Sequence, residues 1–348
     1  MARKRKTLPK DFADLLKGGD LDALKAVFDT CAIDARGGYD KGTALSFPDC
    51  PDELARWLVD QGLDVDEPSQ GSQHTPLQAR ASSWKSIAAL IELGADVNRT
   101  DKYGKTPMHL AAKRPDQLKL LIEAGAEVDP VYNRGITPLR SALISCSNAE
   151  MHYVAESAAV LLAAGAAVPD NAEELITRIG TNFEFHRSNF NSDLIDETEA
   201  GLHRLYDLFG VTPVAPRVVH DGTSRIEVTA TDVAGQYDEL WTLLVPSQGP
   251  AGNIQGEVLR LAGKLAREIS GNGSINWDSD FRTMTDVLGA HLASGNPVAS
   301  TDDLAPVLKR IKTGNAPERD LAQLREAAVA WILANPDPTP LPPPAYQR

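Results

Sequence analysis

The stretch DKYGKTPMHLAAK, residues 101–113, and the segment GAEVDP, residues 125–130, belong to a pattern that recurs along this chain at a fixed spacing. Equivalent segments begin at four threonines: Thr43, Thr75, Thr106 and Thr137. The last three of these threonines follow one another at intervals of 31 residues. Three glycines follow the first three threonines, each 19 residues further on: Gly62, Gly94 and Gly125. A constant spacing of this length predicts a stack of repeated structural units.

Each residue type in the repeat has a mechanical reason for its position. Thr106 is a favoured N-cap residue, and Pro107 occupies a helix position whose N–H would have no intrahelical partner. Pro115 ends the first helix of the unit and can open the second. Gly125 can adopt the left-handed conformation that closes a helix. One unit is therefore predicted to be turn, helix, turn and helix.

The sequence here resembles the ankyrin repeat family, whose motif D-x-x-G-x-T-P-L-H-x-A-A is matched nearly throughout within residues 101–130. The period is shorter than the usual value of about 33 residues, which places a deletion between the two helices of the unit. His109 matches the family histidine that braces neighbouring turns. The other repeats carry a different residue at this position: Ser46, Gln78 and Arg140.

The repeat array is expected to cover residues 11–213, with a capping helix pair at each end. The first cap is predicted within residues 12–34, and the closing pair within residues 171–211. The fourth repeat is longer than the others, because Gly165 follows Thr137 by 28 residues instead of 19. Longer helices are expected to take up these additional residues.

Three further segments are expected outside the array: a basic N-terminal tail, residues 1–10, a mainly helical domain, residues 214–334, and a Pro-rich flexible tail, residues 335–348. Asp221-Gly222 lies between two β-prone runs and predicts a β-hairpin, whereas the rest of the domain has the apolar spacing of helices. The expected fold class is therefore mainly α, an ankyrin-repeat solenoid followed by a small, mostly helical domain with one β-hairpin.

The resemblance implies that the turn tips and the inner helices form a concave face that binds other proteins. The residues at the matching partner-binding positions are Ser72, His74, Trp84, Lys102, Tyr103, Lys105, Lys113, Arg114, Asn133, Arg134 and Ile136. Trp84, Tyr103 and Arg134 are the expected anchors, because aromatic and arginine side chains carry much of the energy of an interface. The alternative for Trp84 is a place between packed helices, where most large aromatic side chains lie.

Negative charge is concentrated in the second half of the chain. The net charge is −13, of which residues 1–168 contribute −3 and residues 169–348 contribute −10. The densest acidic run predicts an acidic surface formed by Asp193, Asp196, Glu197 and Glu199. This balance argues against nucleic acid as a partner and favours either a cationic protein or a solvated acidic face without a partner.

Other sequence signals are mostly negative. The three cysteines are far apart and predict neither a disulfide framework nor a zinc site. The N-terminus lacks the apolar core of a secretory signal, and no window reaches the roughly 18 apolar residues of a membrane span, so a cytoplasmic location is expected. No catalytic residue, metal site or cofactor is predicted, and the oligomeric state stays open.

The leading hypothesis is a non-enzymatic protein that binds another protein. Its more specific form is an immunity or antitoxin protein that occludes a bacterial toxin enzyme, by analogy with other ankyrin arrays. The alternatives are a scaffold or regulatory subunit and an enzyme with an uncharacterised site in the helical domain, for which His220, Asp278 and Asp280 are the residues to test. A Pro-Pro-x-Tyr segment at residues 343–346 has the form that WW domains bind.

Overall fold

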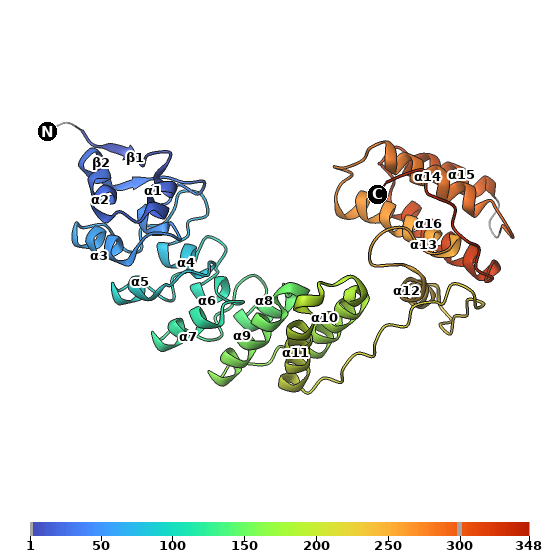
Figure 1. Cartoon of the computed structure of the whole chain (residues 1–348), viewed down its shortest axis with the longest axis horizontal. Coiled ribbons are helices and arrows are strands. Elements are labelled where there is room, and N and C mark those ends of the chain that lie inside the picture. The colour runs from blue at the N-terminus through green and yellow to red at the C-terminus, as the bar shows by residue number, and fades with distance from the viewer. Residues whose placement is uncertain (1–2, 298–300, 348) are drawn as a thin grey trace. The chain divides into compact units, whose positions relative to one another are not determined.

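The computed structural model of the chain describes residues 3–297 and 301–347 (Figure 1). These described residues form two compact units. Unit 1 consists of Met1–Phe183 with Phe190–Val214, and unit 2 consists of Glu184–Asn189 with Ala215–Arg348. Both units are built mainly from helices, so the prediction of a mainly α protein is confirmed.

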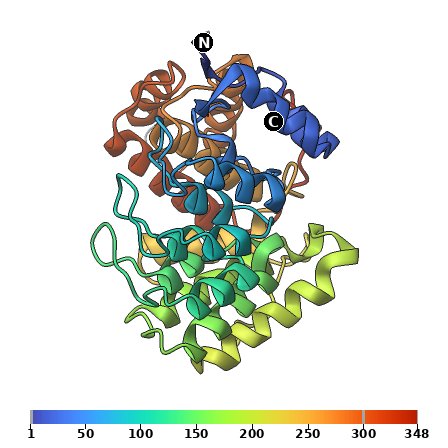
Figure 2. The same ribbon diagram turned by 90° about the vertical axis from the view of Figure 1, so that its left-hand side faces the viewer.

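Unit 1 is a stack of helix pairs, in which an inner row of helices lies beside an outer row (Figure 1). The inner row consists of η1 (Ala44–Ser46), α4 (Pro76–Ala81), α6 (Pro107–Leu110) and α8 (Pro138–Ile144). The outer row consists of α3 (Asp52–Asp60), α5 (Ala88–Glu92), α7 (Pro115–Glu123) and α9 (Met151–Ala163). Helices of successive pairs run side by side in similar directions (Figure 2). The predicted order of turn, helix, turn and helix is therefore the observed one.

Thr75 and Thr137 cap their helices as the sequence predicts, and Gly125 turns the chain as it predicts. The hydroxyl of Thr106 instead lies 3.0 Å from Nδ1 of His109, and Thr43 makes no side-chain capping bond. The side chain of Thr75 accepts a hydrogen bond from the N–H of Gln78, and that of Thr137 accepts one from the N–H of Arg140, both at 3.3 Å. Gly125 follows α7 with a φ of +84°, a conformation that side chains with a Cβ rarely adopt. The local sequence therefore sets where each helix begins and where the chain turns back.

Successive repeats are also joined along their outer loops by one recurring hydrogen bond. The aspartate or asparagine that ends each G-x-x-V-D/N segment accepts from a backbone N–H of the next repeat. The donor and acceptor pairs are Asp96 N to Asp66 (3.1 Å), Glu127 N to Asn98 (2.8 Å) and Ala167 N to Asp129 (2.6 Å). These bonds pair backbone N–H groups of the outer loops and join each repeat to the next.

The outer helix of the fourth repeat and the α-helices that follow it are longer than the helices of the central repeats. The fourth repeat contains the additional 3₁₀ helix η2 (Asn148–Glu150), and its outer helix α9 has 13 residues against 9 in α7. At the first end lie α1 (Phe12–Gly18) and α2 (Leu21–Thr30). Beyond the fourth repeat follow α10 (Ala172–His186) and α11 (Ser192–Phe209), whereas the end of α10 and η3 (Arg187–Asn189) belong to unit 2. Helices α9 and α11 approach so closely that a Cβ at Gly201 would lie 2.7 Å from the Cα of His152.

Part of the basic N-terminal tail predicted over residues 1–10 forms a strand in the residues that the structure describes. Strand β1 (Arg5–Thr7) pairs in parallel with β2 (Cys31–Arg36), and the N–H of Leu8 donates to the carbonyl of Arg36 at 2.9 Å. The Lys6 ammonium lies 2.7 Å from the carboxylate of Asp34. A strand of three residues has too few positions for alternation to be recognised in the sequence. Met1 and Ala2 lie outside the described residues.

Unit 2 is a helical domain with its own apolar core. Its elements are α12 (Val233–Leu244), α13 (Ile254–Ala266), the π-helix η4 (Arg267–Gly271), α14 (Ser279–Leu292), α15 (Thr301–Ile311) and α16 (Glu318–Ala334). Helix α13 packs against α12, α14 and α16, and most of its side chains are buried. Its buried Glu257 forms a two-bond ion pair with Arg260, with nitrogen–oxygen distances of 2.6 and 2.9 Å. Burial alone would raise the pKa of Glu257, but the hydrogen bonds from Arg260 and from the backbone keep this pKa below its usual value.

The predicted β-hairpin around Asp221-Gly222 does not form, because neither run pairs with the other. Residues 211–231 contain no strand in the structure. The N–H of His220 donates to the carbonyl of Leu243 at 3.0 Å, and the N–H of Ile226 donates to that of Pro336 at 2.8 Å. Both runs therefore use their backbone groups on other parts of unit 2, which a local pattern does not reveal.

The prediction of a flexible Pro-rich tail over residues 335–348 is also wrong for the part that the structure describes. The carbonyl of Thr339 accepts a hydrogen bond from the N–H of Ile254 at 2.8 Å, at the start of α13. Tyr346 is 7% exposed, and its hydroxyl donates to the buried carboxylate of Glu257. The tyrosine of the Pro-Pro-x-Tyr segment is thus packed within unit 2 rather than available to a WW domain. Arg348 lies outside the described residues.

Candidate protein-binding surface

Four tight turns precede the inner helices of unit 1, and we call them together the tip row. They comprise residues 37–42, 69–74, 101–105 and 132–136. A backbone hydrogen bond closes each turn: Gly37 N to Gly42 O, Ser69 N to His74 O, Asp101 N to Lys105 O and Tyr132 N to Ile136 O, at 2.9 to 3.1 Å. The sequence predicts the second, third and fourth of these turns, and the structure shows how the repeat period brings one turn from each repeat into the same row.

Neighbouring tips of the row are bonded to one another. The carboxylate of Asp40 in the first tip accepts from the N–H of Ser72 in the second at 2.7 Å and from the hydroxyl of Ser69 at 2.5 Å. The ammonium of Lys102 in the third tip donates to the carbonyl of Gly71 at 2.8 Å. Partial burial alone would raise the pKa of Asp40, but the serine hydrogen bonds hold it below its usual value. Asp40 is therefore a charged structural link.

The tip row contains most of the unusual backbone conformations of unit 1. Positive φ angles occur at four of its residues that have a Cβ: Lys41 (+50°), Gln73 (+61°), Asn133 (+31°) and Arg134 (+66°). Such conformations are uncommon for these residue types and persist only where the surrounding structure determines them. The tips are therefore built to a defined shape.

The structure divides the predicted tip residues into two groups. Lys102, Tyr103, Asn133 and Arg134 are exposed, and Tyr103 shows 63% of its surface to solvent. The others are partly buried: Ser72, His74, Lys105 and Ile136. His74 lies 3.1 Å from the carboxylate of the buried Asp101, so its first role is to join the second tip to the third. Only the first group is exposed to a partner, and within it Lys102 also donates to the carbonyl of Gly71.

His109 braces neighbouring turns, as the resemblance implies. Its Nδ1 accepts a hydrogen bond from the N–H of Thr106 at 3.1 Å, so the proton is on Nε2, which donates to the carbonyl of Ile136 in the fourth tip at 3.1 Å. Gln78 makes the equivalent contacts one repeat earlier, with bonds of 2.7 Å to the carbonyl of Arg99 and 3.1 Å to that of Lys105. The glutamine is therefore a functional equivalent of the histidine.

Trp84 lies in the loop between α4 and α5, residues 82–87, which we call the Trp84 loop. The side chain is 54% exposed, so the interpretation of Trp84 as a residue packed between helices is wrong. The guanidinium carbon of Arg114 lies 3.9 Å from the centroid of its ring, and the ring of Tyr153 lies 4.4 Å away. Three repeats thus contribute to one exposed cluster of aromatic and guanidinium groups.

The backbone of the Trp84 loop is held from two sides. The amide of Gln117, on the next outer helix, donates to the carbonyls of Ser83 and Lys85, both at 3.2 Å. The guanidinium of Arg80, buried at the end of α4, donates to the carbonyl of Ser86 at 2.8 Å. Because the residues on both sides of Trp84 are fixed, the exposed ring has a defined position before any partner binds.

Lys113, also a predicted contact residue, is used within the array. Its ammonium lies 2.7 Å from the carboxylate of Glu150. Burial alone would raise the pKa of Glu150, but Lys113 and Ser147 lower it overall by hydrogen bonding. Lys113 therefore links the third repeat to the fourth, whereas its neighbour Arg114 supports Trp84.

The acidic residues predicted as a surface lie on α11. Asp193, Asp196 and Glu197 are exposed, and Glu199 is partly buried. Glu197 also lies 3.4 Å from Nε2 of His152 on α9. These carboxylates belong to the helix pair after the fourth repeat, so they form a surface separate from the turns of the tip row.

The sequence reasoning missed three surface residues that the structure brings forward. Tyr39 is fully exposed and Lys41 is exposed in the first tip, while the ring of Tyr153 lies 4.4 Å from that of Trp84. The first tip, in the segment GGYDKG, was not predicted because the first repeat matches the motif imperfectly, although the glycines of this segment are a turn signal. Nothing in the local sequence connects Tyr153 with Trp84, because they are separated by two repeats.

Among the described residues, unit 2 contains no cluster of side chains that could hold a metal ion, and the three residues considered for catalysis make structural contacts. No group of three or more His, Cys, Asp or Glu side chains lies close enough there, or in described unit 1, to hold a metal ion. Asp278 caps α14 by accepting from the N–H of Asp280, and Asp280 accepts from the N–H of Gln347. The Nδ1 of His220 accepts from the N–H of Gly222. Asp278 and His220 therefore make contacts with neighbouring residues, and Asp280 contacts the C-terminal segment.

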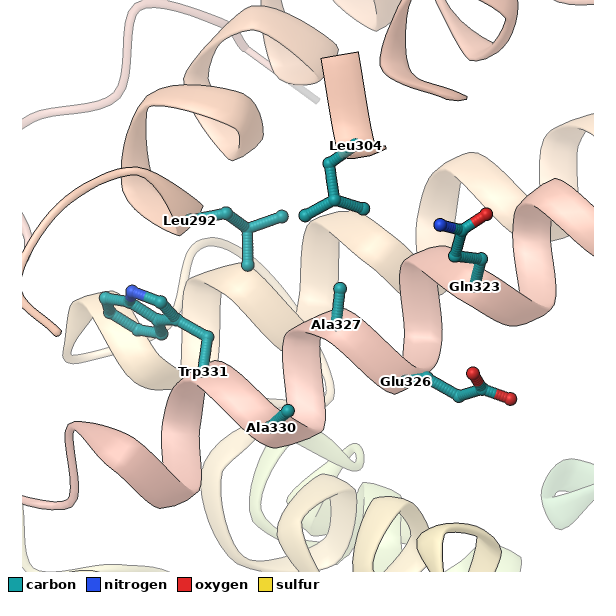
Figure 3. A pocket seen from close by; sticks show the side chains of 7 residues that line it. All are labelled: Leu292, Leu304, Gln323, Glu326, Ala327, Ala330 and Trp331. Carbon is teal, nitrogen blue, oxygen red and sulfur yellow. The ribbon is translucent and has the colours of Figure 1, made fainter. Parts of the chain in front are cut away.

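A pocket of about 220 Å³ in unit 2 is lined mainly by apolar side chains of α14, α15 and α16, including Leu292, Leu304, Ala327 and Trp331 (Figure 3). Ligand sites usually measure roughly 300–1,000 Å³ and contain convergent polar groups. This pocket is smaller, and its polar lining residues, Gln323 and Glu326, lie on the exposed side of α16. None of the helices among the described residues is both long and apolar enough to cross a membrane.

Comparison with known protein families assigns the centre of unit 1. Residues 42–132 match the family model described as ankyrin repeats, in three copies. The match begins in the first tip and ends in the fourth, so it includes the Trp84 loop and the His109 brace. Ankyrin repeats suggest a role in protein–protein interaction, with another protein as the partner. Residues 42–132 of this chain are therefore ankyrin repeats, as the TPLH-type motifs predict.

Proposed function

We propose that this protein is a non-enzymatic binding protein that recognises a partner protein with the exposed surface of its repeats, and that Trp84 is the central anchor. The observation that carries the proposal is the fixed and exposed position of Trp84. Large side chains on soluble proteins are normally buried, and a tryptophan that is held in place while exposed is typical of an interface hot spot.

The contacts of the Trp84 loop explain why this residue suits binding. A flexible anchor loses conformational freedom when a partner binds, which weakens the complex by roughly 0.5–1.5 kcal/mol for each immobilised side chain. Gln117, Arg80 and Arg114 already restrict the loop and the ring. Less of the free energy gained by contact with Trp84 is therefore lost to ordering the side chain when a partner binds.

The test is affinity isolation with the full chain immobilised, comparing the wild type with Trp84→Ala and with Ile275→Ala. Ile275 is a matched control, because it is an apolar side chain that is 80% exposed in unit 2. Wild type and Ile275→Ala should retain one protein in stoichiometric amount. Trp84→Ala should lose it while keeping its circular dichroism spectrum, since removing a hot-spot residue weakens binding by about 2 kcal/mol or more.

Two results would contradict the proposal. One is the absence of any stoichiometric protein partner for the wild-type chain. The other is a partner that Trp84→Ala retains as well as wild type does, which would place the interface elsewhere. Activity of the chain itself that depends on His220, Asp278 or Asp280 would instead favour the enzyme hypothesis.

An immunity or antitoxin protein is the more specific form of this function. It is supported by analogy with other repeat scaffolds and by the net charge of −13, which suits a basic toxin enzyme. In this form the acidic residues of α11 would meet the basic enzyme. The test is inhibition of the enzyme encoded by the neighbouring gene, with Asp193→Lys and Asp196→Lys as variants that should weaken inhibition.

A further inference from the structure

The tip row differs in charge from the rest of the molecule. Its four turns contain three lysines and one arginine against two aspartates, a net charge of +2, whereas the whole chain has a net charge of −13. The basic residues are Lys41, Lys102, Lys105 and Arg134. They are distributed over the first, third and fourth tips, so the positive charge extends along the row.

The two acidic residues of the tip row are already engaged. The carboxylate of Asp40 accepts hydrogen bonds from Ser69 and Ser72, and the buried carboxylate of Asp101 accepts from the N–H groups of Tyr103 and Lys105, both at 2.8 Å. Across residues 3–297 and 301–347, none of the four basic residues forms an ion pair with a carboxylate. The positive charge of the tips is therefore not neutralised within the chain.

Tyrosines are interleaved with these basic residues. The ammonium of Lys102 lies 5.1 Å from the ring centroid of Tyr103, and that of Lys105 lies 4.9 Å from that of Tyr132. Tyr39 adds a fully exposed ring to the first tip. Tyrosine and arginine are enriched in protein interfaces, whereas a face that only keeps a protein soluble does not need aromatic rings.

We propose that the tip row is a docking surface for an acidic segment of a partner protein that also presents apolar or aromatic side chains. This inference rests on the proposed function, because it names the chemistry of a partner for the same repeats. The inter-tip hydrogen bonds and the positive φ angles hold the four turns in one shape, which reduces the entropy lost on binding. The positively charged tips thus favour an acidic segment, whereas the negative total charge of the chain favours a basic partner surface.

An acidic protein segment fits the tip row better than a nucleic acid. A nucleic acid is a dense polyanion, and the negative charge of the rest of the chain opposes its approach. A short acidic segment needs only the local positive potential of the tips. The exposed tyrosines provide contacts for its uncharged side chains, and their hydroxyl groups can donate hydrogen bonds to carboxylates.

The experiment measures fluorescence anisotropy of a labelled random copolymer of glutamate and tyrosine titrated with the full chain. A lysine–tyrosine copolymer and a single-stranded oligothymidylate are the comparison probes. The test variant is Lys41→Glu/Arg134→Glu. The control variant is Lys17→Glu/Lys119→Glu, which changes the net charge equally at exposed positions on α1 and α7. Circular dichroism checks that both variants fold.

The wild type and the control variant should bind the glutamate–tyrosine copolymer saturably, more tightly than either comparison probe, and less tightly as salt is added. The test variant should bind about tenfold more weakly or worse, equivalent to about 1.4 kcal/mol. Equal binding by the test and control variants would overturn the proposal, as would no saturable binding of the copolymer. Tighter binding of the oligothymidylate, lost in the test variant, would assign the tips to nucleic acid instead.

Failure of this proposal and failure of the proposed function are distinguishable. If Trp84→Ala loses the partner while the tip variant keeps it, the binding function stands and the tip row is not the contact for an acidic segment. If no protein partner exists at all, both fall together. Tyr39→Ala is a further variant for the first tip, because its ring is fully exposed and its removal leaves the fold intact.

Discussion

The Nε2 of His109 lies 3.1 Å from the carbonyl oxygen of Ile136, so one imidazole joins the third repeat to the tip of the fourth. Burial lowers the pKa of His109 below its usual value of 6.5, which keeps the ring neutral near pH 7. A neutral ring has one acceptor and one donor nitrogen, and both are used here.

Replacing His109 tests this connection. His109→Ala should lower the free energy of unfolding by about 2 kcal/mol, because it leaves the buried N–H of Thr106 without an acceptor. His109→Gln should restore most of this loss, since Gln78 makes the equivalent bonds in the second repeat. Urea denaturation followed by circular dichroism measures both variants. Equal losses for the two variants would show that the hydrogen bonds are not the cause.

The same histidine predicts a dependence of stability on pH. Because the pKa is lower in the folded than in the unfolded state, the unfolded state binds more protons between the two values. The stability that the neutral ring contributes is therefore fully present above pH 6.5, the unfolded value, and is lost as the pH falls below it. Other groups titrate in the same range, so the measurement is the difference in unfolding free energy between wild type and His109→Gln. This difference should change in favour of the glutamine variant as the solution is acidified.

Gly201 is expected to be the glycine most sensitive to replacement in the α9–α11 contact. An added Cβ would lie 2.7 Å from the Cα and 2.8 Å from the backbone nitrogen of His152, and backbone atoms cannot move aside as a flexible side chain can. Gly201→Ala should lower the unfolding free energy by about 3 kcal/mol. Gly18→Ala is the control, because nothing lies within 4 Å of its Cβ position and alanine should stabilise the end of α1 by about 0.5 kcal/mol. Similar stabilities of the two variants would contradict the close packing.

In unit 2, the buried pair of Glu257 and Arg260 should show strong coupling. Arg260→Met leaves the Glu257 carboxylate, which is 0% exposed, without its cationic partner and should destabilise unit 2 by about 3–5 kcal/mol. The double variant Glu257→Gln/Arg260→Met should recover much of the loss. Differential scanning calorimetry resolves the transitions of the two units. A double variant as unstable as Arg260→Met would mean that lost packing, not the unpaired charge, is responsible.

The C-terminal segment is predicted to contribute to stability through Tyr346. Tyr346→Phe keeps the ring but removes the hydroxyl that donates to Glu257, and it should lower the stability of unit 2 by about 1–2 kcal/mol. Tyr39→Phe should have no effect, because Tyr39 is fully exposed. If Tyr346→Phe unfolds at the same temperature as wild type, the segment is not packed as the structure shows.

The repeat region could be predicted from the sequence because its signals are local. Thr75, Thr106 and Thr137 begin helices through contacts with residues three positions away, and Gly125 turns the chain through its own φ angle. The helices of unit 2 follow in the same way from caps such as Asn253 and from apolar spacing. These rules act within one or two helical turns, so they can be applied to a sequence without knowledge of the fold.

Contacts between distant residues could not be predicted in this way. Trp84 has no local signal for exposure, since its position depends on Gln117 and on Tyr153, which lies two repeats further along the chain. The β-prone runs around Asp221 pair with other parts of unit 2 instead of with each other, and Tyr346 reaches a carboxylate 89 residues away. The partner that a polar group finds depends on which surfaces the fold brings together.

Local sequence signals therefore specify the repeat, the starts of its helices and three of its four tip turns, because capping, proline and glycine act on neighbouring residues. The folded arrangement of the chain sets which turn residues are exposed, leaves the basic residues of the tips without ion pairs among the described residues, and packs both ends of the described chain. The physical reason is that burial and charge compensation depend on contacts between segments that are far apart in sequence.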